Sequence, residues 1–195
     1  MKILAFVDIH GNESALKRVL GKSKIADIII CAGDLTNFEQ KLDQFLEKLA
    51  KTKKPVLIIP GNHETEEKLK EECKKFKSIY YIHKKKYILD DYLFFGYGSG
   101  GFEETDKELD KITRTFTKDN KKLIFVTHMP IYKTRVDFIP NIGHKGSVSA
   151  RNFIEKHNPI LVICGHFHET ASMIDKIKET RIINPGWEGR LITLS

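Results

Sequence analysis

Short apolar runs alternate with amphipathic segments, and this alternation limits the fold of the 195-residue chain more than any other feature. Residues 3–7, 27–32 and 55–59 are apolar and rich in β-branched side chains, as expected of strands covered on both faces. Between them, residues 12–20 and 38–50 carry apolar side chains at helical spacing. This β-α-β-α-β order predicts an α/β fold.

The rest of the chain continues the alternation less regularly. We expect a surface helix over 64–77, antiparallel strands within 79–97 and a glycine-dense turn or loop over 96–101. Turn-forming residues and the lack of a sustained period predict a long loop over 130–146. Further helices are expected over 103–116 and 147–157, and further strands over 122–127, 160–164, 171–175, 181–184 and 191–194. The length fits a single domain over residues 1–195.

The net charge of +7 admits two interpretations. A basic surface attracts anionic partners such as nucleic acid or phosphorylated substrates. The lysines, however, lie in short clusters rather than in one long stripe, which is typical of a solvated surface. Nucleic acid is therefore a possible partner but not the favoured one.

The cysteines and the N-terminal run bear on the cellular compartment. Cys31, Cys73 and Cys164 form no C-x-x-C pair and no even disulfide framework, which fits a reducing compartment. The apolar run that ends at Asp8 is too short for the core of a signal peptide. No stretch approaches the roughly 20 apolar residues of a membrane span. We expect a soluble, cytoplasmic protein that does not associate with membranes.

Polar motifs follow the strand-like runs, and five of the 8 histidines lie in them. Functional groups of open α/β sheets gather beyond the carboxyl ends of strands. Carboxylate, imidazole and amide donors without a thiolate suit Mn, Fe, Zn, Ni or Co. Each motif alone could be a turn, a helix cap or a satisfied histidine, but their number, order and placement predict a site for two divalent metals. The motifs are Asp8-Ile9-His10, Gly33-Asp34, Gly61-Asn62-His63-Glu64, Thr127-His128 and Gly165-His166-Phe167-His168.

The turns beside these motifs contain glycines. Gly33 and Gly165 would let the chain turn sharply next to the metals, where a Cβ atom would crowd the site.

The series Asp-x-His, Gly-Asp-x-x-Asn, Gly-Asn-His-Glu, His and Gly-His-x-His resembles the calcineurin-like metallophosphoesterase superfamily over residues 8–168. The resemblance implies a four-layer αββα sandwich of two mixed β-sheets flanked by helices. It also implies two divalent metal ions, manganese foremost, with nickel, cobalt, iron or zinc as alternatives. The implied reaction is hydrolysis of phosphate esters, with phosphodiesters preferred, by a hydroxide that bridges the two metals.

Carried onto this sequence, the resemblance implies a set of seven ligands. One metal would bind Asp8, His10 and His168. The second would bind Asn62, His128 and His166. Asp34 would bridge the two metals.

The resemblance also implies a catalytic histidine that binds no metal. His63, together with Asn62, would lie beside the phosphate, and His63 would stabilise the transition state or protonate the leaving group. Many relatives have an aspartate that orients this histidine, three residues after the bridging aspartate. This chain has Asn37 there, which should hold the ring without adding negative charge and so support an imidazolium less well.

Three further positions each have two interpretations. Asn12 would either contact phosphate or cap the first helix, and the cap is favoured. The segment 141–147, with Lys145, would either contact the substrate or form a helix entry capped by Ser147. Trp187 would either stack on a base or leaving group or pack against the protein, and packing is favoured.

The expected substrate is a small phosphate ester or nucleotide. A nuclease and a phosphomonoesterase of the same superfamily are the alternatives. A non-catalytic scaffold is disfavoured, because the retromer-subunit branch that lost catalysis also lost metal-site residues, whereas every ligand position is filled here. The aromatics Tyr80, Tyr81 and Phe102 would form the face of a possible homodimer or belong to the core.

Overall fold

The computed structural model describes residues 1–98, 100 and 103–194. Within these residues the α-helices are α1 (Glu13–Ser23), α2 (Leu42–Ala50), α3 (Glu66–Cys73), α4 (Lys107–Thr115) and α5 (Val148–His157). A short 3-10 helix, η1, covers His168–Thr170. The strands are β1 (Lys2–Phe6), β2 (Ile28–Cys31), β3 (Val56–Ile58), β4 (Ile79–Tyr81), β5 (Lys85–Leu89), β6 (Tyr92–Tyr97), β7 (Lys122–Thr127), β8 (Phe138–Ile139), β9 (Gly143–His144), β10 (Leu161–Ile163), β11 (Ile174–Ile177), β12 (Thr180–Ile183) and β13 (Arg190–Thr193).

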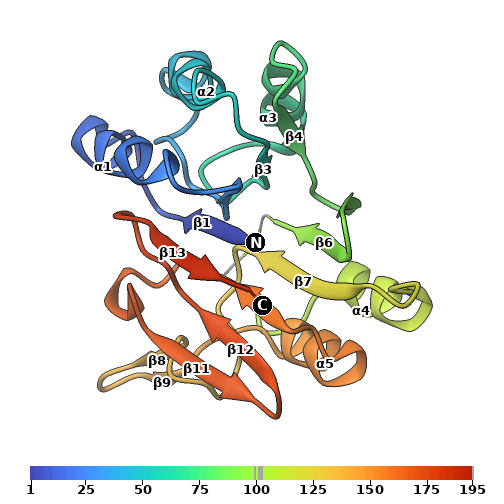
Figure 1. The fold of residues 1–195 in the computed structure, drawn as a ribbon. Helices are drawn as coiled ribbons and strands as arrows, with labels where there is room; N and C mark the ends of the chain where they lie inside the picture. Colours follow the sequence, from blue (N-terminus) through green and yellow to red (C-terminus); the bar gives the residue numbers. More distant parts are fainter. Residues whose placement is uncertain (99, 101–102, 195) are drawn as a thin grey trace.

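The strands form two large mixed sheets that face each other (Figure 1). The first sheet has the order β13-β1-β2-β3-β4, in which only β13 runs antiparallel to its neighbour. The second has the order β11-β12-β10-β7-β6-β5, with its two outermost pairs antiparallel. The parallel strands at the middle of each sheet end at the same edge, so the loops that follow them meet there.

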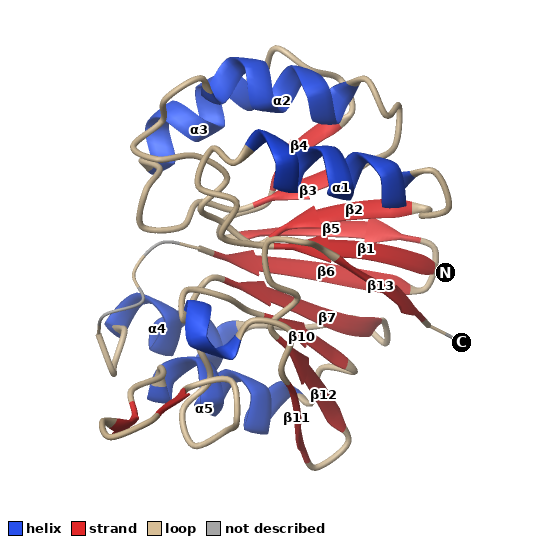
Figure 2. Cartoon of the chain, turned by 90° about the vertical axis from the view of Figure 1, so that its left-hand side faces the viewer, coloured by secondary structure: helices blue, strands red, loops and turns tan. Residues whose placement is uncertain are grey.

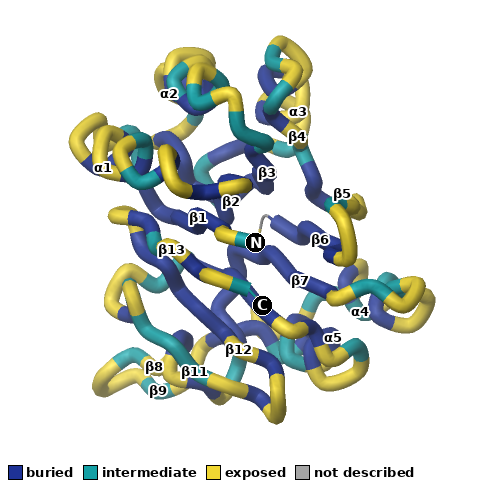
Figure 3. Tube along the Cα trace, in the orientation of Figure 1, coloured by how far each residue is buried: buried dark blue, intermediate teal, exposed yellow. Residues whose placement is uncertain are grey.

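Three apolar layers hold this arrangement together, and β1 shows how the sequence produces them. Because side chains alternate across a strand, Ile3 and Ala5 pack into the layer between the two sheets, whereas Leu4 and Phe6 pack under α1 and α2. A third layer lies between the second sheet and α4 and α5. Figure 2 shows α1, α2 and α3 above the paired sheets and α4 and α5 below them, and Figure 3 shows buried strands beneath helices with exposed outer faces. The expected αββα sandwich is confirmed.

Some local predictions were wrong. The strand β4 is not antiparallel but pairs parallel to β3, and only β5 and β6 form the expected hairpin. The helix expected from residue 38 begins at Leu42, because Phe38, Glu39 and Lys41 have positive φ angles, which an α-helix does not allow. The segment 130–146 is not wholly irregular, since β8 and β9 pair within it.

Two predicted features fall partly outside the described residues. They are the glycine-dense segment 96–101 and the suggested dimer residue Phe102. Among the helices that the structure describes, none has the length and apolar character needed to span a membrane.

Candidate metal centre

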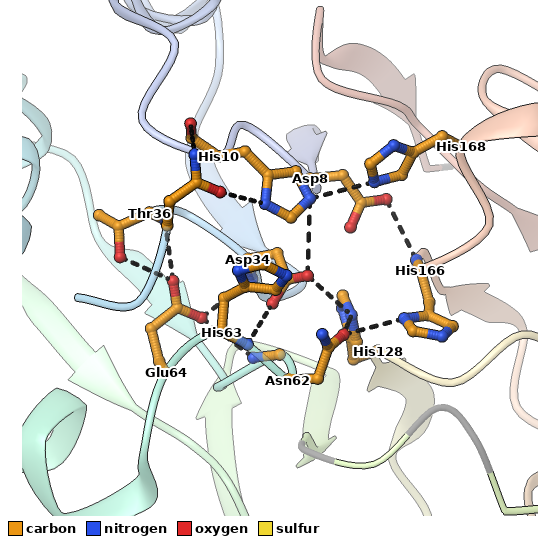
Figure 4. Close-up of polar contacts among 12 residues, drawn as sticks. Asp8, His10, Asp34, Thr36, Asn62, His63, Glu64, His128, His166 and His168 are labelled. Atoms are coloured by element: carbon orange, nitrogen blue, oxygen red, sulfur yellow. Dashed lines mark hydrogen bonds and ion pairs between the residues drawn. The ribbon is translucent and has the colours of Figure 1, made fainter. Parts of the chain in front are cut away.

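The seven expected ligands lie together at the edge where the parallel strands of both sheets end (Figure 4). The loops after β1, β2 and β3 contribute side chains from the first sheet, and the loops after β7 and β10 contribute them from the second. This placement follows from the topology, because parallel neighbours end at the same edge. Among the described residues, donor atoms lie within 4.8 Å of one another in three groups: Asp8 with His10 and His168, Asp8 with Asp34 and His128, and His10 with Asp34 and His63. The first is the expected ligand set of one metal, and the third includes His63, which was expected to bind no metal.

The backbone is strained at four of the expected ligands. Asp8, His10, Asp34 and His166 all have positive φ angles, of 55°, 48°, 51° and 71°. Non-glycine residues rarely adopt this region, and each such residue costs on the order of 1–3 kcal/mol, which the surrounding contacts must offset. The side chains of these four residues lie around a common centre (Figure 4).

Glycines allow the first-sheet loops to approach one another. A Cβ atom on Gly33, whose φ is +102°, would lie 2.7 Å from the Nδ1 atom of His128 and from the backbone nitrogen of Gly61. A Cβ atom on Gly61 would lie 2.0 Å from the Asp34 Oδ1 atom. Gly165 differs from the expectation, because its Cβ would meet the side chain of Val7 at 2.2 Å, in the layer between the sheets. The missing Cβ of Gly165 therefore leaves room for the Val7 side chain in the layer between the sheets.

Polar contacts connect the side chains of the expected ligands into one network that spans the two sheets. The Nε2 atom of His10 lies 3.0 Å from Nε2 of His168 and 3.6 Å from Oδ2 of Asp34. The same Asp34 oxygen lies 3.4 Å from Nε2 of His128. Asn62 Oδ1 extends this network, because it lies 3.1 Å from His128 Nε2 and 2.9 Å from His166 Nδ1. Asp34 therefore stands between the two ligand groups, as a bridging ligand must.

Two imidazoles of this network, those of His10 and His166, have lowered pKa values, which favours their neutral form. Burial lowers the pKa of His10, and burial together with the neighbouring His128 lowers the pKa of His166 to about 4. A neutral imidazole has the lone pair that a metal requires. The Nδ1 atom of His10 faces the Asn37 Oδ1 atom at 3.0 Å and donates to it, so Nε2 is the nitrogen left for a metal.

His128 and Asp34 form the buried middle of the centre. Burial disfavours the charged form of His128, but the hydrogen bond and charge of Asp34 outweigh it and raise the pKa of His128 to about 9. Burial likewise opposes ionisation of Asp34, but contact with His128 lowers the pKa of Asp34 to about 2. His128 Nδ1 donates to the carbonyl of Ala32, at 2.9 Å, so its Nε2 faces Asp34. A positive charge is therefore favoured between His128 Nε2 and the Asp34 carboxylate. A divalent cation can bind these two groups in place of the proton.

Unpartnered buried atoms also indicate a cation. Asp8 is buried, and although its Oδ2 accepts a hydrogen bond from the backbone of His166, its Oδ1 has no hydrogen-bond partner among the described residues. Burial raises the pKa of Asp8 above its ordinary value. A buried carboxylate oxygen without a donor is costly unless a cation binds it. The donor set of this centre therefore fits divalent metal ions.

Glu64 is a residue of the centre whose role the sequence analysis missed. Its buried carboxylate accepts hydrogen bonds from the backbone N–H groups of Asp34, Thr36 and Gly61, at 3.0, 2.8 and 3.2 Å. Burial raises the pKa of Glu64 to about 7. The carboxyl group thus ties the loop that carries Asp34 to the loop that carries Asn62. Its position directly after His63 in the motif was the available signal.

The expected contact between Asn37 and His63 is not the contact that the structure contains. The Asn37 side chain binds His10 twice, through Oδ1 to the ring and through Nδ2 to the His10 carbonyl oxygen at 3.0 Å. The loop after β2 lies between the loops after β1 and β3, and the Asn37 side chain turns to the β1 loop. His63 lies at the centre through its backbone N–H, which donates to Asp34 Oδ1 at 2.9 Å. Its Nδ1 has no hydrogen-bond partner among the described residues.

The remaining positions fall into two groups. Asn12 caps α1 by accepting from the backbone of Ala15 at 3.0 Å, and Ser147 caps α5. Lys145 is exposed, and its backbone donates to the Asp137 carbonyl oxygen in the segment that leads to α5. Trp187, by contrast, is 38% exposed and lies next to His168, with ring centroids 6.4 Å apart. Most of Trp187 is covered, which fits the favoured packing interpretation, and its exposed part lies beside His168.

Comparison with known proteins agrees with this geometry. A family model described as calcineurin-like phosphoesterase matches residues 1–170. Protein MJ1162 of Methanocaldococcus jannaschii is 32% identical over 198 residues, covering 95% of this chain and 88% of that protein. A probable glycerophosphodiester phosphodiesterase, GpdQ, of Arcobacter nitrofigilis is 26% identical over 169 residues, covering 76% of this chain and 59% of that protein. The crystal structure of TT1561 of Thermus thermophilus shares the fold, with a TM-score of 0.75 and 18% identity over 96% of this chain and 90% of that one.

Proposed function

The chain belongs to the calcineurin-like phosphoesterase family, and from this membership we propose that it hydrolyses phosphodiesters with two divalent metal ions. The proposed ligands of one ion are Asp8, His10 and His168. The proposed ligands of the other are Asn62, His128 and His166, and Asp34 is shared.

The position of Asp34 is the observation that carries this proposal. One carboxylate oxygen lies within 3.6 Å of ring nitrogens from both ligand groups, His10 on one side and His128 on the other. A carboxylate placed in this way can touch two metals at the 3.5–4 Å separation, roughly, of two-metal sites. Bound divalent ions would lower the pKa of a water and stabilise charge on the phosphoryl oxygens.

The protein groups around the ions would orient the ligands and handle the leaving group. Asn37 and the Ala32 carbonyl hold the outer nitrogens of His10 and His128, which fixes the nitrogen that each ring presents to a metal. The backbone of His63 donates to Asp34 and its ring lies 4.6 Å from that of His10, so we assign the His63 ring to the phosphate and the leaving-group oxygen. Asn37 then acts on the metal ligand His10, and it does not prepare His63 for acid catalysis.

The charges of the centre support a diester over a monoester. The residues assigned to it are carboxylates, imidazoles and an amide, and they include no lysine or arginine. A phosphodiester carries one negative charge, whereas a monoester carries nearly two near neutral pH and more often requires a cationic side chain. The similarity to a probable glycerophosphodiester phosphodiesterase points in the same direction.

The test is a substrate comparison with metal-reconstituted protein. Manganese is the first metal to supply, followed by nickel, cobalt, iron and zinc. We expect bis(p-nitrophenyl) phosphate to be hydrolysed with a larger kcat/KM than p-nitrophenyl phosphate. A His144→Ala variant, which removes a histidine outside the centre, is the control and should retain activity. Preference for the monoester, or no hydrolysis with any of these metals, would contradict the proposal.

A further inference from the structure

Aromatic rings form a row that includes residues of the metal centre and ends on both sides in exposed side chains. His63, His10 and His168 are the middle of the row, with ring centroids 4.6 and 4.9 Å apart. Phe38 continues it beyond His63 at 4.5 Å, and Trp187 continues it beyond His168 at 6.4 Å. Both end rings are accessible, because Phe38 is 74% exposed and Trp187 is 38% exposed.

Phe38 is held in an unfavourable position by contacts on both sides of it. Its φ of 46° lies in the left-handed region, which bulky residues avoid, and its large apolar side chain faces solvent. On one side, Asn37 is bound to His10. On the other, Glu39 accepts hydrogen bonds from the backbone and hydroxyl of Thr65, at 2.8 and 2.6 Å. These anchors fix the ring against His63, and such strain points to a function.

Trp187 is also placed by contacts of its neighbours. The preceding turn is tied to the loop of the second-sheet ligands, because the Asn184 side chain donates to the Phe167 carbonyl oxygen and to Thr170 Oγ1. The following residues accept hydrogen bonds from Lys22 through the carbonyl oxygens of Glu188 and Gly189, both at 2.8 Å. Trp187 is therefore presented between two fixed segments, beside His168.

We propose that Phe38 and Trp187 are the two recognition walls of the substrate site, and that the substrate carries a planar aromatic group on each side of the scissile phosphate. A dinucleotide, with one nucleobase on each side, has this chemistry. The inference rests on the proposed function, which places the phosphate at the histidines between the two walls. An aromatic wall accepts any base, because every base has a π face, so the walls select for planar groups and not for one base.

Trp187 provides a direct binding signal, because it is the single tryptophan of the chain. With the metal-loaded protein, AMP should quench the tryptophan emission, whereas ribose 5-phosphate, which lacks the base, should not. Phe38→Leu removes the ring from the other wall and should leave this quenching in place. Equal responses to AMP and ribose 5-phosphate would overturn the proposal.

The kinetic test uses two diesters with the same leaving group, bis(p-nitrophenyl) phosphate and methyl p-nitrophenyl phosphate. The Phe38→Leu/Trp187→Leu double variant should lower the kcat/KM ratio of the first to the second by roughly tenfold, the loss of one aromatic stack. Phe138→Leu removes an aromatic ring that is 47% exposed and lies outside the row, and it should leave the ratio unchanged.

The outcomes separate this inference from the proposed function. If the double variant hydrolyses both esters with the wild-type ratio, the two walls do not recognise the substituents and this inference alone is wrong. If the wild-type protein with bound metal hydrolyses neither ester, the proposed function fails and this inference fails with it.

Discussion

The two sheets contribute different chemistry to the same centre. The first sheet supplies both carboxylates, Asp8 and Asp34, on loops that Glu64 and Asn37 tie together through hydrogen bonds. The second sheet supplies only imidazoles, which range from the buried His128 to the exposed His168. Negative charge and rigidity thus come from the first sheet, and imidazoles from the second complete the site. Changes on the first sheet should therefore cost more than matched changes on the second.

The largest expected effect is the loss of the shared carboxylate. Asp34→Asn keeps the shape of the side chain but removes its charge and its affinity for two metals, so kcat/KM for the aryl diester should fall by roughly a thousandfold or more. His168→Ala removes one exposed ligand of one metal and should reduce kcat/KM by a smaller factor. Steady-state kinetics at saturating metal measures both variants. An equal or greater loss in His168→Ala would break the comparison between the sheets.

The second expected effect concerns rigidity. Glu64→Ala leaves the backbone N–H groups of Asp34, Thr36 and Gly61 without their acceptor and should lower the free energy of unfolding by about 3–4 kcal/mol. Glu72 is the matched control, because it is equally buried but pairs with the exposed amino groups of Lys68 and Lys75. Urea unfolding of metal-free protein measures both variants. An equal loss of unfolding free energy in Glu64→Ala and Glu72→Ala would show that Glu64 stabilises the first-sheet loops no more than another buried carboxylate does.

The difference between the sheets was only partly visible in the sequence. Strand-like runs and helical stripes predicted the α/β order, because burial on both faces of a strand leaves a direct apolar signature. The polar motifs predicted a site for two divalent metals, because functional groups gather beyond the carboxyl ends of strands, whereas the individual ligand assignments came from the family resemblance. The four-layer sandwich came from the family resemblance.

What the sequence did not reveal depends on side-chain direction and loop conformation. Asn37 was expected to orient His63, but its side chain turns from the loop after β2 to the neighbouring β1 loop and binds His10. Phe38 was assigned to a helical stripe, because its apolar character fits the period, although its backbone turns into the left-handed region. Local pattern does not encode either outcome, since both depend on contacts between segments far apart in the chain.

A smaller effect should appear where the two sheets meet away from the centre. His83 follows β4 of the first sheet, and its Nδ1 accepts from the backbone of Gly98, beyond β6 of the second, at 2.8 Å. Burial lowers the pKa of His83 to about 4, although Glu66 lies 3.0 Å from its Nε2. An unfolded histidine titrates near about 6.5, so the unfolded state binds a proton first as pH falls. Stability should drop between about pH 6.5 and pH 4, by about 2–3 kcal/mol.

His83→Gln isolates this contribution. Glutamine can accept from Gly98 and donate to Glu66 but does not titrate. The free energy of unfolding, measured by urea at each pH, should therefore fall less steeply with acid in the variant than in the wild type. Parallel curves for the two proteins would mean that protonation of His83 does not weaken the contact between the sheets.

The smallest expected effect distinguishes two roles of Asn12, a helix cap and a contact to phosphate. Asn12 caps α1 on the first sheet, so Asn12→Ala should lower the free energy of unfolding by about 1 kcal/mol and leave KM for the aryl diester unchanged. Thermal unfolding and kinetics on the same preparation provide both values. A raised KM with unchanged stability would instead place Asn12 on the phosphate and extend the first-sheet side of the site.

The most direct test of the central claim is the metal content of the protein. After reconstitution with manganese and removal of loosely bound ions, mass spectrometry of the metal should find two equivalents per chain in the wild type and fewer than two in Asp34→Asn. Two equivalents that fall on loss of Asp34 are the result expected if this carboxylate joins two metals. One equivalent or none in the wild type, or an unchanged content in Asp34→Asn, would contradict the account of the centre.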